Sequence, residues 1–138
     1  MKLSYPTVFY HNEEENVYVA VVPDLPGCST GGDTFEEAYE MAVDAASGWI
    51  LCELEEGRQP PNPSDISKIK TEDKTLGKGF TSMLFVDMDS YSEKYGIKSV
   101  RKSLTIPSWL NTYAESKNLN FSKILQEALI KIWKKEAA

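Results

Sequence analysis

The residues whose types and spacing suggest a definite chemistry lie in the segment ArgLysSerLeuThrIlePro at positions 101–107. In an extended strand, successive side chains point to opposite faces. Leu104 and Ile106 then share one apolar face. The other face carries three polar side chains: Arg101, Ser103 and Thr105. Paired with an identical strand, this face would form a ribbon narrow enough for the DNA major groove, where its side chains can donate to or accept from base edges.

The basic residues of this segment suit two kinds of DNA contact. Arg101 suits guanine best, because a guanidinium can donate two hydrogen bonds to that base. Lys102 breaks the alternation, and we expect it to extend from the ribbon edge toward a phosphate. The alternative interpretation is an exposed edge strand that is protected by charge.

Patterns typical of enzymes are weak in this chain. His11 is the only histidine, which excludes a metal cluster of several histidines. It lies in an acidic loop, and we expect a solvated turn residue there and no histidine-dependent catalytic triad. GlyGlyAsp at 31–33 and GlyLysGly at 77–79 lack the spacing of phosphate-binding motifs and are predicted to be turns. The run at 13–15 is interpreted as a solvated hairpin tip that could also meet a basic protein. We predict no catalytic residues, no metal and no cofactor.

The formal net charge of −6 conceals a division along the chain. Residues 1–95 hold 7 Lys/Arg against 18 Asp/Glu, a balance of −11, and residues 96–138 hold 8 against 3, a balance of +5. The basic end could approach nucleic acid, whereas the acidic part would be repelled by it and would favour a basic protein. Ordinary solvated surface charge is the alternative.

The compartment is predicted from hydropathy and from the cysteines. No apolar run approaches the roughly 20 residues that span a bilayer, and the first residues lack the apolar core of a signal peptide. We therefore expect a cytoplasmic protein without membrane contact. Cys28 and Cys52 fit that compartment as a pair of buried, reduced thiols.

The first part of the chain predicts a sheet covered by a helix. Residues 3–10 and 17–22 are rich in β-branched and aromatic side chains and should form a hairpin, and 28–30 can add a short strand. Gly31 and Gly32 would permit a tight bend after it. A capping box of Thr34 and Glu37 then begins a helix, whose apolar spacing continues to a stop at Gly57.

The middle of the chain returns to the sheet after a long excursion. Residues 58–79 are rich in proline and polar side chains and are predicted to be a loop with some local order. Residues 80–88 have strand character and should pair with the opening hairpin, which completes a β-β-β-α-β layer. Residues 90–98 are the predicted linker.

The last 40 residues predict a short strand at 100–106, a break at Pro107, and two helices separated by LysAsnLeuAsn. The second helix has one apolar stripe: Phe121, Ile124, Leu125, Ala128, Leu129, Ile132 and Trp133. These elements bury too little apolar area to fold alone, so we expect a homodimer that could pair further into a tetramer. The predicted dimer core is Leu104, Ile106, Leu125, Leu129 and Trp133.

This succession of strand, proline, helix, turn and amphipathic helix resembles the ribbon-helix-helix family of bacterial repressors. The resemblance implies that Arg101, Ser103 and Thr105 read bases. It also implies that the second helix binds a phosphate through its first backbone amides. The residues at that position are Asn120, Phe121 and Ser122, with Lys123 nearby. The dipole of the helix favours an anion there, although an ordinary capped helix would look the same in sequence.

Residues 17–50 resemble the HicB antitoxins. The matching pattern is a strand that leads into ProAspLeuProGlyCys, a glycine-containing turn, ThrPheGluGluAla and a helix. The resemblance implies a partial RNase H-like layer that inactivates a small basic ribonuclease toxin of the HicA type, with an appended DNA-binding domain. Asp24, Leu25, Pro26 and Gly27 have an alternative role as scaffold, because proline and glycine fix backbone angles in any protein.

A residual nuclease is the least favoured hypothesis. RNase H chemistry needs carboxylates that converge on a divalent metal, the first of them from the opening strand, and residues 2–10 contain no acid. The hypothesis survives only if Asp24, Asp33, Asp44 or Asp87 converge on a metal.

The prediction is therefore an α+β antitoxin that is not an enzyme. A partial RNase H-like β-β-β-α-β domain at 1–89 would neutralise the HicA-type toxin, and a β-α-α ribbon-helix-helix domain at 99–138 would dimerise and bind operator double-stranded DNA to repress its own operon. The alternative is a stand-alone transcription regulator whose N-terminal domain senses a small ligand.

Overall fold

The chain divides into two compact units, Met1–Ile97 and Lys98–Ala138, and each is described by itself. The structure is a computed structural model and describes residues 1–95 and 100–137.

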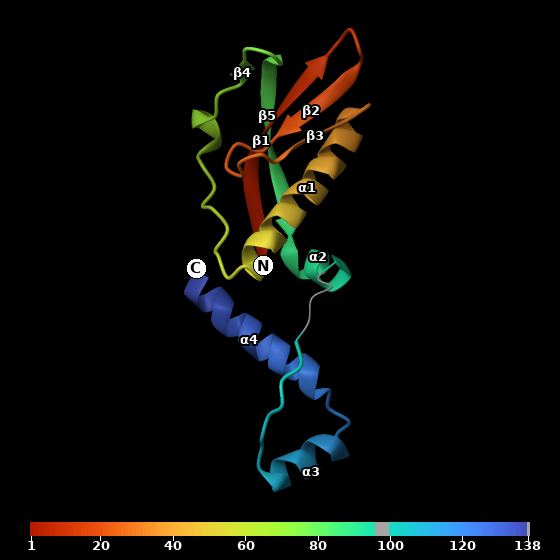
Figure 1. The fold of residues 1–138 in the computed structure, drawn as a ribbon, viewed down its shortest axis with the longest axis vertical. Helices are drawn as coiled ribbons and strands as arrows, with labels where there is room; N and C mark the ends of the chain where they lie inside the picture. Colours follow the sequence, from red (N-terminus) through yellow and green to blue (C-terminus); the bar gives the residue numbers. More distant parts are fainter. Residues whose placement is uncertain (96–99, 138) are drawn as a thin grey trace. The chain divides into compact units, whose positions relative to one another are not determined.

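The first unit is built on an antiparallel sheet with strand order β3-β2-β1-β5-β4 (Figure 1). The strands are β1 (Lys2–Asn12), β2 (Val17–Val21), β3 (Ser29–Gly32), β4 (Glu72–Asp73) and β5 (Gly77–Asp87). The predicted opening hairpin is confirmed, with Tyr10 opposite Val19. The predicted return strand is also confirmed, because β5 pairs with β1 along most of its length.

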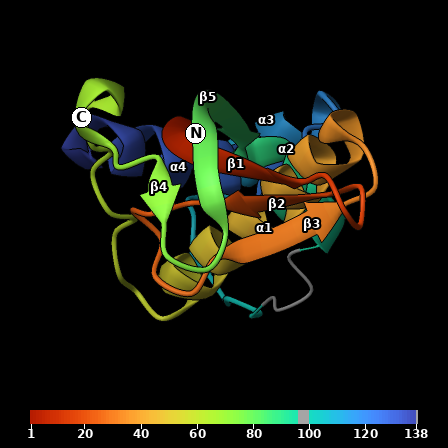
Figure 2. The ribbon, with the colours of Figure 1, turned by 90° about the horizontal axis from the view of Figure 1, so that it is seen from above.

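A single long helix, α1 (Phe35–Glu55), covers one face of the sheet (Figure 2). The predicted start is confirmed, since the Thr34 side chain accepts a hydrogen bond from the Glu37 amide at 3.1 Å. The buried residues Ala38, Ala42, Ala46 and Ile50 recur every four positions. Small side chains at that spacing let the helix axis approach the strands closely.

The glycine pairs in the sheet correct one prediction. Gly31 and Gly32 lie within β3, and Gly77 and Gly79 lie within β5, so both motifs belong to strands. Three of them allow a close approach, and a Cβ added at Gly32 would lie 2.6 Å from the Ala38 amide nitrogen. Gly77 has open space around it and instead adopts a φ of 84° directly after the turn between β4 and β5. The sequence resembled a turn because it contains glycines, but packing against α1 explains the residue at Gly32.

The core lies between α1 and the sheet. Its largest fully buried side chains include Tyr5, Phe9, Leu25 and Leu84. Phe9 stacks at 5.8 Å between ring centroids against Phe80, a residue that lies directly opposite it on β5. Alternation along β1 therefore places Tyr5 and Phe9 toward α1 and Tyr10 on the other face.

One of the two cysteines differs from its prediction. Cys28 is buried in the core, and burial raises the pKa of its thiol. Cys52 is exposed, so the prediction that both thiols are buried is wrong for this residue. Cys52 lies near the end of α1 on the side away from the buried stripe of alanines, which explains its exposure.

The excursion and the segment after β5 have local structure. The excursion contains a short 3-10 helix, η1 (Ile66–Lys68), before β4. The predicted linker is helical at its start, in α2 (Met88–Tyr95), and its remaining positions 96–98 lie outside the described residues. The Met88 amide donates to the Met1 carbonyl at 2.9 Å, so α2 begins beside the first residue of the chain.

The second unit contains the two predicted helices, α3 (Ser108–Ser116) and α4 (Phe121–Ala137). The Pro107 carbonyl accepts hydrogen bonds from the Leu110 and Asn111 amides, each at 3.1 Å, and this begins α3. The turn that follows contains Asn118 in the left-handed region, with a φ of 53°. The prediction that this unit contains two helices separated by a short turn is confirmed.

Candidate nucleic-acid and protein-binding sites

The predicted base-reading residues lie in a segment that belongs to no helix or strand. Arg101, Ser103 and Thr105 are all exposed. The predicted strand at 100–106 is absent from the described part of this single chain. A strand requires a neighbour for its backbone hydrogen bonds. Leu104 and Ile106 are also exposed, at 64% and 41%, so the face predicted to be buried has no cover within the chain.

The predicted phosphate-binding residues lie together at the start of α4. The Asn120 side chain accepts a hydrogen bond from the Lys123 amide at 3.0 Å, and the Asn120 carbonyl accepts from the Ile124 amide at 3.0 Å. Asn120 therefore caps the helix. Phe121 and Ser122 follow, and the first amides of a helix have no acceptor within the helix itself. The geometry is that of an anion site, and its occupation by a phosphate stays a prediction.

The predicted dimer-core stripe of α4 is largely uncovered. Leu129 is 55% exposed, and Ile132 is 58% exposed. Leu125 and Trp133 are half-buried. Among the described residues 100–136, Ala114 is the single residue classed as buried. The apolar faces of this unit thus lack a sufficient partner within one chain.

The turn at Asp24, Leu25, Pro26 and Gly27 is tied to the rest of its own unit. The Asp24 carboxylate accepts from the Ser64 amide at 2.8 Å and from its hydroxyl, and the Pro26 carbonyl accepts from the Trp49 indole at 3.0 Å. Leu25 is fully buried, and Gly27 adopts a φ of 80° that favours glycine. Each residue has a structural task here, which agrees with a scaffold role.

The four aspartates of the nuclease hypothesis are not brought together. Asp24 contacts Ser64, and Asp87 contacts Ser90. Across residues 1–95 and 100–137, no group of three histidine, cysteine or acidic side chains could hold a metal ion. His11 is exposed, stacks on Tyr18 at 4.3 Å between ring centroids, and lies 3.2 Å from the Asn16 side-chain oxygen.

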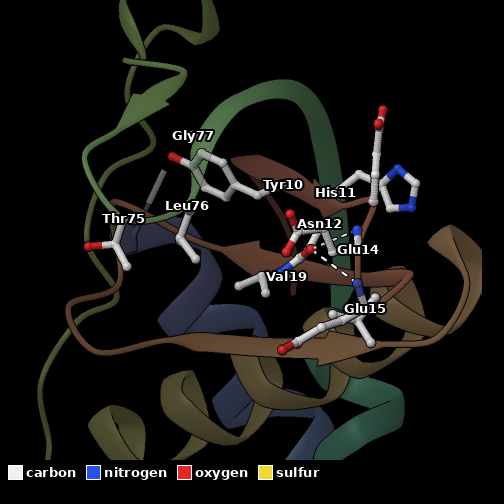
Figure 3. A pocket seen from close by; sticks show the side chains of 11 residues that line it. Tyr10, His11, Asn12, Glu14, Glu15, Val19, Thr75, Leu76 and Gly77 are labelled. Carbon is white, nitrogen blue, oxygen red and sulfur yellow. Dashed lines mark hydrogen bonds between the residues drawn. The ribbon is translucent and has the colours of Figure 1, made fainter.

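A hollow of about 470 Å³ lies at the hairpin end of the sheet, on the face away from α1 (Figure 3). Tyr10, Val17 and Val19 form its apolar part, and the turn between β4 and β5 contributes Leu76. Glu13, Glu14 and Glu15 line its other end. Figure 3 shows Tyr10 and Leu76 on one side and Glu14 and Glu15 on the other, with Val19 between them.

Sequence reasoning missed this hollow, although two signals for it are present. Tyr10 and Val19 have the same parity along the hairpin, which places them on one face. Gly79 lies directly opposite Tyr10, and a Cβ there would lie 2.9 Å from the Tyr10 ring. The glycine therefore makes room for the aromatic ring. The depth of the hollow depends on the excursion at 58–79, whose path was not predictable.

Comparison with known proteins identifies the family of this chain. Residues 5–128 match the model of the HicB-like antitoxins of bacterial toxin-antitoxin systems. The chain belongs to this family. The match extends over both units of the chain, the acidic unit of sheet and helix and the basic helical unit that follows it.

Two relatives share the pattern over part of the chain. The chain is 40% identical over 62 residues to antitoxin HicB 2 of Photorhabdus laumondii, which covers 45% of this chain and 43% of that protein. It is 41% identical over 51 residues to an uncharacterised 14.9 kDa protein of Haemophilus phage HP1, which covers 37% and 38%. The match thus spans less than half the length of either relative.

Two solved structures resemble the whole fold. One is a chain of a toxin-antitoxin complex from Streptococcus pneumoniae, with a TM-score of 0.63, 26% identity, and coverage of 95% of this chain and 99% of that chain. The other is the antitoxin HicB of Burkholderia pseudomallei, with a TM-score of 0.54, 21% identity, and coverage of 94% and 98%. In the described part of the chain, no helix combines the length and hydropathy needed to cross a membrane.

Proposed function

We propose that this chain is an antitoxin that inhibits a HicA-type, mRNA-cleaving ribonuclease toxin and represses its own operon by binding operator DNA as a homodimer. The observation that carries the proposal is the contrast between the two units of this member of the HicB-like family. The first unit is acidic and buries its apolar side chains in a core, and the second unit is basic and has exposed apolar faces.

Dimerisation follows from the energetics of the second unit. Burying a large aliphatic or aromatic side chain stabilises a protein by about 1.5–3 kcal/mol relative to leaving it exposed. The exposed apolar side chains of residues 100–137 include Leu104, Leu129 and Ile132. A second copy supplies complementary faces at once, because a two-fold interface uses the same surface on both subunits.

DNA binding follows from the same dimer. Two extended segments at 100–106, paired antiparallel, would form a two-stranded ribbon of the ribbon-helix-helix type. Arg101, Ser103 and Thr105 of both copies would then face bases in the major groove, and Lys102 would reach a phosphate from the ribbon edge. The capped start of α4 would bind a further phosphate, with Lys123 beside it.

Toxin binding is assigned to the first unit. Residues 1–95 have a balance of −11, which attracts a basic protein and repels nucleic acid. The similar chain from Streptococcus pneumoniae belongs to a toxin-antitoxin complex, and its 26% identity extends over nearly all of this chain. A domain that covers the RNA-binding face of the toxin would inhibit it without any catalytic step.

Two experiments test the proposal. The tagged full chain is co-expressed with its neighbouring reading frames, and we expect a small basic protein to co-purify. The purified full chain is also mixed with DNA from upstream of its own gene, and we expect a mobility shift that competitor DNA of unrelated sequence does not remove. A chain that binds DNA but retains no partner protein would instead favour a stand-alone regulator.

A further inference from the structure

The hollow at the hairpin end of the sheet has a size and a lining that suit a long cationic side chain. Its volume of about 470 Å³ lies in the range of roughly 300–1,000 Å³ that is usual for binding pockets. One part of its lining is apolar and the other part is acidic. Lysine and arginine have the matching form, since an aliphatic stem carries a charged end.

The apolar part is fixed by the sheet. Tyr10 is only 7% exposed, and its ring lies against Gly79, which has no side chain to displace it. Val19 lies opposite Tyr10 on β2 and is half-buried. The aromatic ring and this valine together offer a surface for a methylene chain, and a tyrosine face also attracts a cation.

Side-chain hydrogen bonds hold both walls of the hollow. The Asn12 side-chain oxygen accepts from the Glu14 amide at 3.1 Å and from the Glu15 amide at 3.2 Å, which orders the hairpin tip. Across the hollow, the Asp73 carboxylate accepts from the Thr75 and Leu76 amides at 2.8 and 2.9 Å, which orders the turn after β4. The hollow is therefore largely preformed, which limits the entropy lost on binding.

The acidic end has no cation of its own. Within residues 1–95, neither Glu14 nor Glu15 forms an ion pair with a lysine or arginine. Burial, and secondly the charge of Asp73, raise the pKa of the Tyr10 phenol. The hollow thus combines an apolar part with two glutamates that have no ion-pair partner among the described residues 1–95.

We propose that this hollow receives one arginine or lysine side chain of the toxin, with its stem against Tyr10, Val19 and Leu76 and its charged end at Glu14 and Glu15. This inference rests on the proposed function and names the part of the first unit that docks the toxin. The occupant is a protein side chain, because the whole first unit is acidic and a basic protein is complementary to all of it.

The test uses two pairs of full-length variants and the purified toxin, with affinity measured by isothermal titration calorimetry. Leu76→Arg places a cation of the chain itself over the hollow, and its matched control is Ile66→Arg, since both leucine and isoleucine are 36% exposed. Glu14→Gln with Glu15→Gln removes the acidic end. Its matched control is Glu40→Gln with Asp44→Asn, an equal loss of charge on exposed positions of α1.

We expect Leu76→Arg and the Glu14/Glu15 pair each to weaken toxin binding at least about tenfold, a loss of roughly 1.4 kcal/mol, while both controls stay near the parent affinity. The urea midpoint of the first unit, in which Trp49 lies, is measured for every variant, and an unchanged midpoint shows that this unit is folded. Equal affinities for variants and controls, or equal losses in both, would overturn the inference while leaving the antitoxin function in place. A parent chain that binds no toxin but binds a small cation such as a polyamine in the hollow would overturn both.

Discussion

The two units of the chain differ in how many of their large apolar side chains are buried. Among the described residues of Met1–Ile97, five large apolar side chains are exposed, and a continuous core lies between α1 and the sheet. Among those of Lys98–Ala138, which is less than half as long, twelve are exposed. The first unit has two layers that cover each other, whereas the second has helices without a second layer.

This difference shows what amphipathic patterning does and does not determine. Both α1 and α4 carry an apolar stripe at helical spacing. In α1 the stripe meets the sheet of the same chain, but α4 finds no such surface in its own unit. The same sequence signal therefore corresponds to a buried face in one unit and an exposed face in the other. A second copy is the partner that we propose for the exposed face.

The largest effect is expected for Trp133→Ala, which tests whether the second unit is completed by a copy of itself. Removing an aromatic side chain that is buried in the dimer should destabilise the dimer by about 3–5 kcal/mol. Sedimentation equilibrium should show dissociation at micromolar concentration, and the mobility shift with operator DNA should be lost. Lys131→Ala, on the exposed side of α4, is the control. An unchanged dimer would contradict the placement of Trp133 in its core.

Leu25→Ala makes the corresponding change in the first unit. Leu25 is fully buried, so the cavity should lower the free energy of unfolding by about 2–5 kcal/mol. Urea denaturation followed by tryptophan fluorescence measures this loss, and the unfolding of this unit should not depend on protein concentration. Leu76→Ala, at a partly exposed position, should have a much smaller effect. A change in the dimerisation of the Leu25→Ala chain would contradict the independence of the two units.

Arg101→Ala tests whether DNA binding and toxin binding belong to different units. If Arg101 donates two hydrogen bonds to a guanine, its loss should weaken operator binding by about 1–3 kcal/mol and relax base preference at one position in each half-site. Competition mobility shifts with single-base operator variants measure both effects. Toxin affinity should be unchanged, because the substitution lies outside the acidic unit. Lys117→Ala, an exposed lysine at the end of α3, controls for the loss of one positive charge.

The two cysteines give the smallest expected effect. Exposed Cys52 should react with a thiol reagent within the native protein, while buried Cys28 should react only after unfolding, since the thiolate is the reactive form and the pKa of Cys28 is raised. The folded pKa of Cys28 lies above its ordinary value of 9.0, so the contribution of this thiol to stability is constant below that pH and falls as the pH rises further. Counting the thiols that react fast and slowly, in the parent and in Cys52→Ala, checks the predicted difference in reactivity.

Much of the first unit could be predicted from local signals. Alternation and β-branched residues located β1, β2 and β5, and the Thr34 capping box located the start of α1. Gly31, Gly32 and Gly79 were misinterpreted as turn residues, because glycine is required there by close packing between elements that are distant in sequence. The exposure of Cys52 was also missed, since it depends on which side of α1 faces the sheet.

The sites were predictable where they depend on local structure alone. The Asn120 cap and the helix that follows it are local features, and the structure places them as predicted. The predicted strand at 100–106 is absent from the single chain, and its pairing with a second copy stays a prediction. The hollow depends on the path of a loop between β4 and β5, for which sequence spacing gives no rule.

The measurement that tests the central claim most directly is growth rescue in cells that express the neighbouring small basic protein. We predict that this protein alone arrests growth, that the full chain restores growth, and that Arg101→Ala restores it equally while losing repression of a reporter under the operon's own promoter. A chain that fails to restore growth, although it is folded and expressed, would contradict the antitoxin role. Loss of rescue with Arg101→Ala would contradict the division of two functions between two units.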